Sequence, residues 1–167
     1  MTVTRREALG VLAGAGLVLH GCSTGGSLVL DDNDARFINR AGFGPRPADL
    51  ESLKKSGRSA WLEDQLSPGS SEPLALTLAL SRMPVNNLLA WELRDWPKRE
   101  VIRQAQQTDL LYAIYSPWQV RERMVDFWTN HFNIFGNKGL AAYRIPTDQR
   151  EVVRKHALGS FPAMLRS

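Results

Sequence analysis

The sequence contains a single cysteine, Cys22, among 167 residues. One cysteine excludes an internal disulfide and a metal site built from thiolates. The 21 lysines and arginines outnumber the 17 aspartates and glutamates, which gives a formal net charge of +4, but they form no basic run. Because nucleic-acid-binding proteins concentrate such charge in a patch or run, the sequence gives no support for nucleic-acid binding.

Long hydrophobic runs and alternating patterns are also lacking. No segment after residue 21 reaches the roughly 20 apolar residues that a membrane-spanning helix needs, and no stretch alternates apolar and polar residues long enough to predict a strand. What is present is 43% hydrophobic residues, with five tryptophans and six phenylalanines, which is enough for a globular core. We therefore expect an all-α fold, a multi-helical and irregular helical array.

Residues 1–21 have the pattern of a signal peptide. Arg5 and Arg6 stand just before an uncharged stretch, residues 8–19, that is too short to span a bilayer. The arginine pair resembles a twin-arginine export signal, which the twin-arginine translocase reads. We therefore expect export to the periplasm or cell envelope.

Residues 19–22, Leu-His-Gly-Cys, resemble the lipobox at which lipoprotein signal peptidase cuts. Cleavage there would make Cys22 the acylated first residue, and the acyl chains would hold the protein to a membrane. Residues 22–31, which include Ser-Thr-Gly-Gly-Ser, would then form a flexible tether. The alternative is a plain secretory signal followed by a cysteine without a special role.

Caps and helix breakers divide the remaining chain, residues 32–167, into helices. The expected helices run from about Asp31 to Ala41, from Pro47 to Gly57 and around Trp61 to Leu66, then over Leu74–Ser81, Val85–Trp96, Lys98–Tyr115 and Trp118–Phe135, with a last one starting at Ser160.

The segment Trp118–Phe135 contains most of the candidate site residues. Placed at 100° per residue, its apolar side chains cover an arc of about 200°, which predicts a largely buried helix. Arg121 and His131 fall inside that apolar arc. A buried arginine needs a charged or hydrogen-bonding partner, so we expect one for Arg121.

His131 is a candidate catalytic residue because imidazole changes charge near neutral pH. The alternative is a histidine that is buried and satisfied within a helical core. A metal site would need a second ligand, and His156 is the other histidine after residue 21, so His131 and His156 are weak metal candidates. Glu122, Asp126 and Asn130 recur every four residues and form a polar ridge, which is more typical of a solvated or packing face than of an acid–base pair.

Three segments of the chain resemble a large bacterial group known as domain of unknown function 1800 (DUF1800). They are Glu122-Arg-Met-Val-Asp-Phe-Trp-Thr-Asn-His-Phe-Asn-Ile-Phe135 with Lys138-Gly139, Arg40 to Pro47 with Trp61-Leu62 and Gln65-Leu66, and Arg150 to Arg154 with His156 to Gly159 and Phe161. The resemblance implies an exported, mostly helical protein and supplies no activity, cofactor or catalytic residue. Many members have a second histidine where this chain has Thr129. Members usually run to several hundred residues, so we expect residues 32–167 to be the N-terminal part of the domain, an incomplete fragment of a larger helical fold.

Two functions fit these observations. The first is an exported, lipid-anchored scaffold or partner protein that acts through another exported protein. The second is an exported hydrolase or metal-assisted enzyme that uses His131 with groups from a missing C-terminal part. The sequence discloses neither a cofactor nor a substrate, so enzyme activity stays open.

Overall fold

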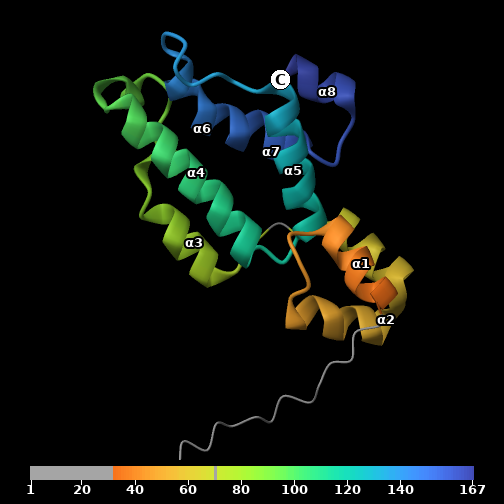
Figure 1. The fold of residues 1–167 in the computed structure, drawn as a ribbon. Helices are drawn as coiled ribbons and strands as arrows, with labels where there is room; N and C mark the ends of the chain where they lie inside the picture. The colour runs from red at the N-terminus through yellow and green to blue at the C-terminus, as the bar shows by residue number, and fades with distance from the viewer. Residues whose placement is uncertain (1–31, 70) are drawn as a thin grey trace, which may run out of the picture. The chain divides into compact units, whose positions relative to one another are not determined.

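The computed structural model describes residues 32–69 and 71–167 (Figure 1). The predictions for the signal peptide, Cys22 and the tether concern residues outside this range. The elements, in chain order, are α1 (Asp32–Ala41), α2 (Pro47–Leu66), α3 (Leu74–Ser81), the 3₁₀ turns η1 (Pro84–Asn86) and η2 (Glu92–Asp95), α4 (Lys98–Tyr115), α5 (Gln119–Phe132), the 3₁₀ turn η3 (Ala141–Arg144), α6 (Ile145–Asp148), the π-helical turn η4 (Gln149–Val153), α7 (Arg154–His156) and α8 (Phe161–Arg166).

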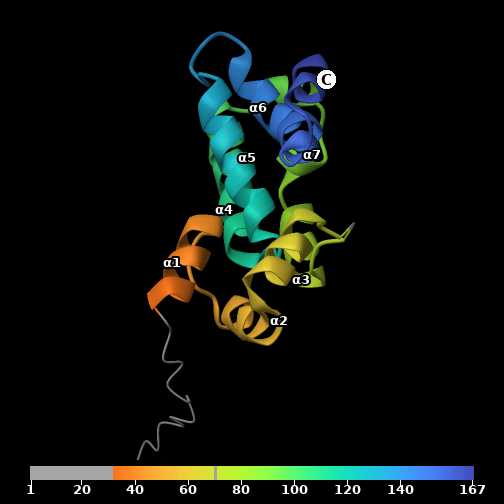
Figure 2. The same ribbon diagram turned by 90° about the vertical axis from the view of Figure 1, so that its right-hand side faces the viewer.

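The all-α prediction is confirmed, since the described residues contain helices and turns but no strand. None of the described helices is both long and apolar enough to cross a membrane. In Figures 1 and 2, α1 and α2 pack near the N-terminal end of α5, while α7 and α8 lie toward its C-terminal end. Helix α4 contacts α3 on one side and α5 and α6 on another.

Gly57 divides α2 into the two helices that the sequence predicts. Its φ of 80° and ψ of 167° lie in a region that side chains other than glycine rarely adopt. The first half buries Leu50 and Leu53, and the second buries Trp61. The Trp61 ring meets Phe37 of α1 edge-on, with 5.6 Å between centroids. The break therefore lets both halves of α2 turn an apolar side inward.

The predicted helix over Val85–Trp96 is wrong. This stretch forms only the short turns η1 and η2. The Glu92 carboxylate accepts a 2.7 Å hydrogen bond from the backbone N–H of Leu89, which favours a new turn over a continuing helix. Val85 and Leu93 are still fully buried, in a cluster with Val101 and Tyr143.

The turn between α4 and α5 is fixed by buried side-chain amides. Gln119 donates to the carbonyl groups of Ala113 and Ser116 at 3.1 and 3.0 Å, and it accepts from the backbone N–H of Phe43 at 3.2 Å. Gln65 donates to the carbonyl of Pro117 at 3.0 Å. These bonds satisfy backbone groups that the end of α4 leaves free and set the direction in which α5 leaves the turn.

Helix α5 is shorter and more exposed than predicted. It ends at Phe132 because Asn133 adopts a left-handed conformation, with φ 36°. Its buried residues are Gln119, Glu122 and Val125, whereas the predicted apolar arc is otherwise partly buried or, at its C-terminal end, exposed. The prediction of a largely buried helix is therefore wrong: other elements cover only part of α5, and Glu122 is the one residue of the polar ridge that they bury.

The C-terminal part of the chain forms a continuous helical segment, α6, η4 and α7, followed by α8. The helical patterns in the sequence predict none of the first three elements. Ser160 caps α8 as predicted, since its side chain accepts from the backbone N–H of Ala163. The π-helical turn η4 lies between α6 and α7, so it begins at Gln149 and is followed directly by Arg154, two residues that line the same cleft.

Candidate functional site

A network of ion pairs surrounds Glu122 on α5. The Glu122 side chain is 3% exposed, and its two oxygens accept from Arg154 and, at 3.0 Å, from Arg121. Arg121 also pairs with Glu72. The two arginine side chains are each 14% exposed. Alternating charges with filled hydrogen bonds offset the desolvation that isolated buried charges would suffer. The predicted partner of Arg121 is therefore confirmed.

Arg154 also contacts α4. Its guanidinium lies over the ring of Tyr112, 3.5 Å from the centroid. Such a cation–π contact, added to the ion pair with Glu122, fixes the guanidinium between two helices. Arg154 therefore connects α7 to both α4 and α5.

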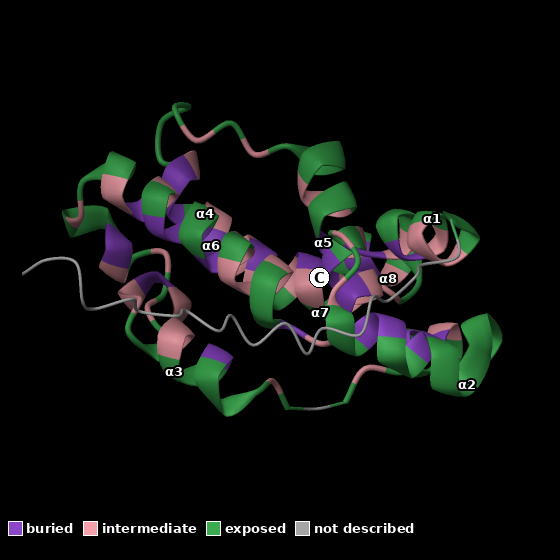
Figure 3. Ribbon diagram, turned by 60° about the horizontal axis from the view of Figure 1, so that its bottom comes forward, coloured by how far each residue is buried: buried purple, intermediate pink, exposed green. Residues whose placement is uncertain are grey.

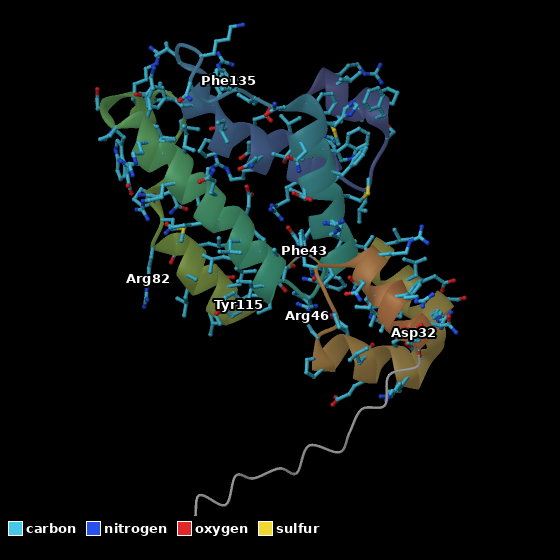
Figure 4. The ribbon with its side chains drawn as sticks, in the orientation of Figure 1. Asp32, Phe43, Arg46, Arg82, Tyr115 and Phe135 are labelled. Atoms are coloured by element: carbon cyan, nitrogen blue, oxygen red, sulfur yellow. The ribbon has the colours of Figure 1, made fainter. Side chains whose placement is uncertain are left out.

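A cleft of about 640 Å³ opens between α4 and α5. Apolar side chains from both helices and from the segments that follow α5 form much of its wall. They include Ile102, Leu110, Val125, Ile134, Phe135 and Ile145. Phe43 lies beside the N-terminal end of α5 and Phe135 at the other end of the cleft (Figure 4). A cleft of this size is in the range of small-molecule sites.

Asp109 of α4 is a partly buried carboxyl group in this cleft. Its pKa is raised to about 6, chiefly by burial and to a smaller extent by the neighbouring carboxylates Glu122 and Asp126, against a hydrogen bond from Gln149 and the charge of Arg154, which lower it. The Gln149 Nε2 group donates to Asp109 Oδ2 at 2.9 Å. The pKa of Asp109 thus lies closer to neutral pH than that of an ordinary aspartate.

The predicted polar ridge lies along the cleft. Glu122, Asp126 and Asn130 all line it, but their environments differ. Glu122 is buried in the ion pairs, whereas Asp126 is exposed and accepts a 3.0 Å hydrogen bond from Asn130. The ridge is therefore neither wholly solvated nor wholly packed against another helix.

His131 is exposed, and the expectation of a buried histidine is wrong. Its ring stacks on Phe127 at 5.8 Å and meets the edges of Trp128 and Phe132. Phe161 of α8 stacks on Trp128 at 5.6 Å. We call Phe127, Trp128, His131, Phe132 and Phe161 the aromatic surface. Figure 3 shows the C-terminal end of α5 in green, as exposed, and residues 130–133 there are all exposed.

The two histidines do not come together in a metal site. His131 belongs to the aromatic surface, and His156 is partly buried at the end of α7. Within residues 32–69 and 71–167, no group of three histidine, cysteine, aspartate or glutamate residues is arranged to hold a metal ion. Arg5, Arg6 and Cys22 lie outside the described residues.

Asp109, Gln149 and Arg154 line the cleft but were not predicted as site residues. A signal existed for Asp109, which stands four residues from Ala105 and from Ala113 on the inward side of α4. A carboxylate among such residues marks a buried charge. No comparable pattern marked Gln149 or Arg154, because Gln149 begins the π-helical turn η4 and Arg154 directly follows it, where a regular helical spacing does not apply.

The described residues thus define an all-helical domain with an acidic cleft and an exposed aromatic surface. The family described as "Protein of unknown function (DUF1800)" matches residues 36–167. The chain belongs to this family. No curated protein and no solved structure matches it significantly.

Proposed function

We propose that this chain is an exported, lipid-anchored protein of the periplasm or cell envelope that acts by binding another exported protein. Arg5 and Arg6 support export through the twin-arginine translocase. Cys22, in its lipobox-like setting, supports cleavage by signal peptidase and an acyl anchor in a membrane. The main support for the binding role is the exposed aromatic surface.

Three phenylalanines of that surface are unusually accessible. Phe127 is 52% exposed, Phe132 40% and Phe161 44%. Trp128 beneath them is held in place, since its Nε1 group donates to the carbonyl of Ala157 at 3.2 Å. Aromatic side chains are enriched at protein interfaces and often supply most of the binding free energy. A fixed group of stacked rings is thus suited to a partner that presents apolar side chains.

The surroundings of His131 favour binding over catalysis. The ring contacts of His131 are with Phe127, Trp128 and Phe132. A histidine that acts as a general base needs an orienting hydrogen-bond partner and a cavity for substrate. A hydrolytic or metal-assisted role for His131 remains the second prediction, and stoichiometric metal in a purified full-length relative would support it.

The proposal is tested by the native mass of the protein after mild detergent extraction from the cells that produce it. Wild-type protein should run in a complex with a second protein, identified by mass spectrometry. The double variant Phe127→Ser, Phe132→Ser should run without that partner. The control is Leu74→Ser, Leu78→Ser on α3, where the side chains are 74% and 53% exposed.

The control variant should keep the partner, because α3 lies outside the aromatic surface. A partner that survives in the phenylalanine variant would contradict the proposed surface. A wild-type complex made only of copies of this chain would contradict a partner of different sequence.

A further inference from the structure

The charges in the cleft between α4 and α5 do not balance. Its lining contains the carboxylates Asp109, Glu122 and Asp126 but a single cation, Arg154. Arg154 already pairs with Glu122 and stacks on Tyr112. The cleft therefore carries an excess of negative charge at neutral pH.

The three carboxylates differ in how well they are satisfied. Glu122 has two arginine partners, and Asp126 has Asn130 and a long, 3.5 Å contact with Arg123. Asp109 receives a hydrogen bond only from the neutral amide of Gln149. Among the described residues, no cation lies within ion-pair distance of Asp109. It is thus the carboxylate in the cleft that lacks a counter-ion.

Apolar walls near Asp109 increase the energetic effect of the missing counter-ion. Ile102 and Leu110 of α4 and Val125 of α5 line the same cleft. An ionised carboxylate beside such side chains is poorly solvated. Pairing it with a positive charge therefore lowers the free energy more than the same pairing would in water. The same walls would accept the hydrocarbon part of a ligand.

We propose that this cleft binds a small organic amine, with the ammonium group paired to Asp109 and its hydrocarbon body against the apolar walls of α4 and α5. An anionic ligand of the same size would be repelled by the excess carboxylates. A neutral one would leave Asp109 without a counter-ion. The site is separate from the aromatic surface and does not depend on the partner-binding role.

The ammonium group needs an ionised Asp109, so binding depends on pH. The charged groups that face Asp109 in the cleft are Glu122 and Asp126 from α5 and Arg154 from α7, and η4 contributes the neutral Gln149. Asp109 also borders a second cavity, whose lining includes Glu72 and Arg150. Burial raises the pKa of Asp109 to about 6. At pH 5 about a tenth of such a group is ionised, so binding should be about tenfold weaker than at pH 7.5.

The probe is n-hexylamine, titrated into the full chain and followed by NMR chemical shifts or calorimetry, with hexanol and hexanoate for comparison. Hexylamine should bind at pH 7.5, with hexanol and hexanoate weaker by about tenfold or more. The Asp109→Asn variant should bind hexylamine more weakly than wild type by a similar factor. Its side-chain amide keeps an oxygen that can accept the hydrogen bond from Gln149. The matched control is Asp95→Asn on η2, an exposed site outside the cleft, which should bind like wild type.

Equal binding of hexylamine and hexanoate, or unchanged binding by Asp109→Asn, would overturn the proposal. If the Asn variant does not fold, the pH series on the wild-type chain decides instead. Affinity for hexylamine that is the same at pH 5 and pH 7.5 would then contradict a role for Asp109 as counter-ion.

Discussion

Arg154 and Glu122, separated by 32 positions in the sequence, form a buried ion pair that joins α7 to α5. The guanidinium simultaneously covers the ring of Tyr112 on α4. One side chain thus holds together the three helices that enclose the cleft. The apolar clusters nearby are small, for example Val125 with Val153 and Ala157. We therefore expect the ion pair to contribute a large part of the free energy that holds these helices together.

Replacing Arg154 with Met should destabilise the chain strongly. The variant keeps much of the side-chain volume but leaves the buried Glu122 with Arg121 as its one cationic partner. We expect a loss of about 3 kcal/mol in the free energy of unfolding, measured by urea denaturation. The control is Arg36→Met, because the Arg36–Asp32 pair has side chains 73% and 75% exposed, and it should lose less than about 0.5 kcal/mol. Equal losses would contradict the proposed importance of the buried pair.

Asp109→Asn should stabilise the ligand-free chain at neutral pH. The folded chain raises the pKa of Asp109 from its ordinary value of 3.8 to about 6, so folding favours the protonated form. Stability therefore falls as pH rises from 4 through 6, and Asn removes this loss. We expect a gain of about 1–2 kcal/mol at pH 7.5 that nearly vanishes at pH 4.

Urea denaturation at both pH values measures this difference. Asp95→Asn, at an exposed position, should change the free energy of unfolding by less than about 0.5 kcal/mol at either pH. An Asp109→Asn variant less stable than wild type at pH 7.5 would show that Asp109 is not destabilised by burial.

Gly57→Ala should weaken the junction inside α2. A side chain at φ 80° and ψ 167° is strained even though a Cβ there would meet no atom within 4 Å. The expected loss is about 1–3 kcal/mol in thermal or urea unfolding. Gly159→Ala is the control, because its Cβ would be in ordinary contact, 3.4 Å from the carbonyl oxygen of His156. Similar losses for both variants would argue against backbone strain at Gly57.

Cys22→Ala should release the protein from membranes. The described helices include none that could span a bilayer, and the proposed anchor is the acyl group on Cys22. Metabolic labelling with palmitate and membrane fractionation measure the effect, with Ser23→Ala as the control. A Cys22→Ala protein that still sediments with membranes would contradict the acyl anchor.

Local signals were sufficient for much of the fold. Proline and glycine fix where α2 begins and breaks, and Pro97 and Ser116 bound α4, whose range was predicted to the residue. Ser160 likewise marks the start of α8. Each of these features depends on residues within a turn of one another, which a sequence pattern can reveal.

The site depended instead on contacts between distant residues. The apolar arc of α5 was visible, but whether other helices cover it is a tertiary property, and His131 and Phe132 remain exposed. Arg154 pairs with Glu122 across 32 positions of the sequence, and it directly follows the irregular turn η4, which no local pattern revealed. The predicted helix over residues 85–96 does not form for a similar reason. A hydrogen bond from the backbone N–H of Leu89 to the Glu92 carboxylate competes with helix formation.

The central claim, that the aromatic surface holds a protein partner, is tested most directly by photo-crosslinking in living cells. The photoreactive residue p-benzoylphenylalanine would replace Phe132 in one strain and Leu78 of α3 in another, both at exposed positions. We expect one protein adduct from position 132 and none of the same mass from position 78. No adduct at 132, or the same adduct from both positions, would contradict the claim.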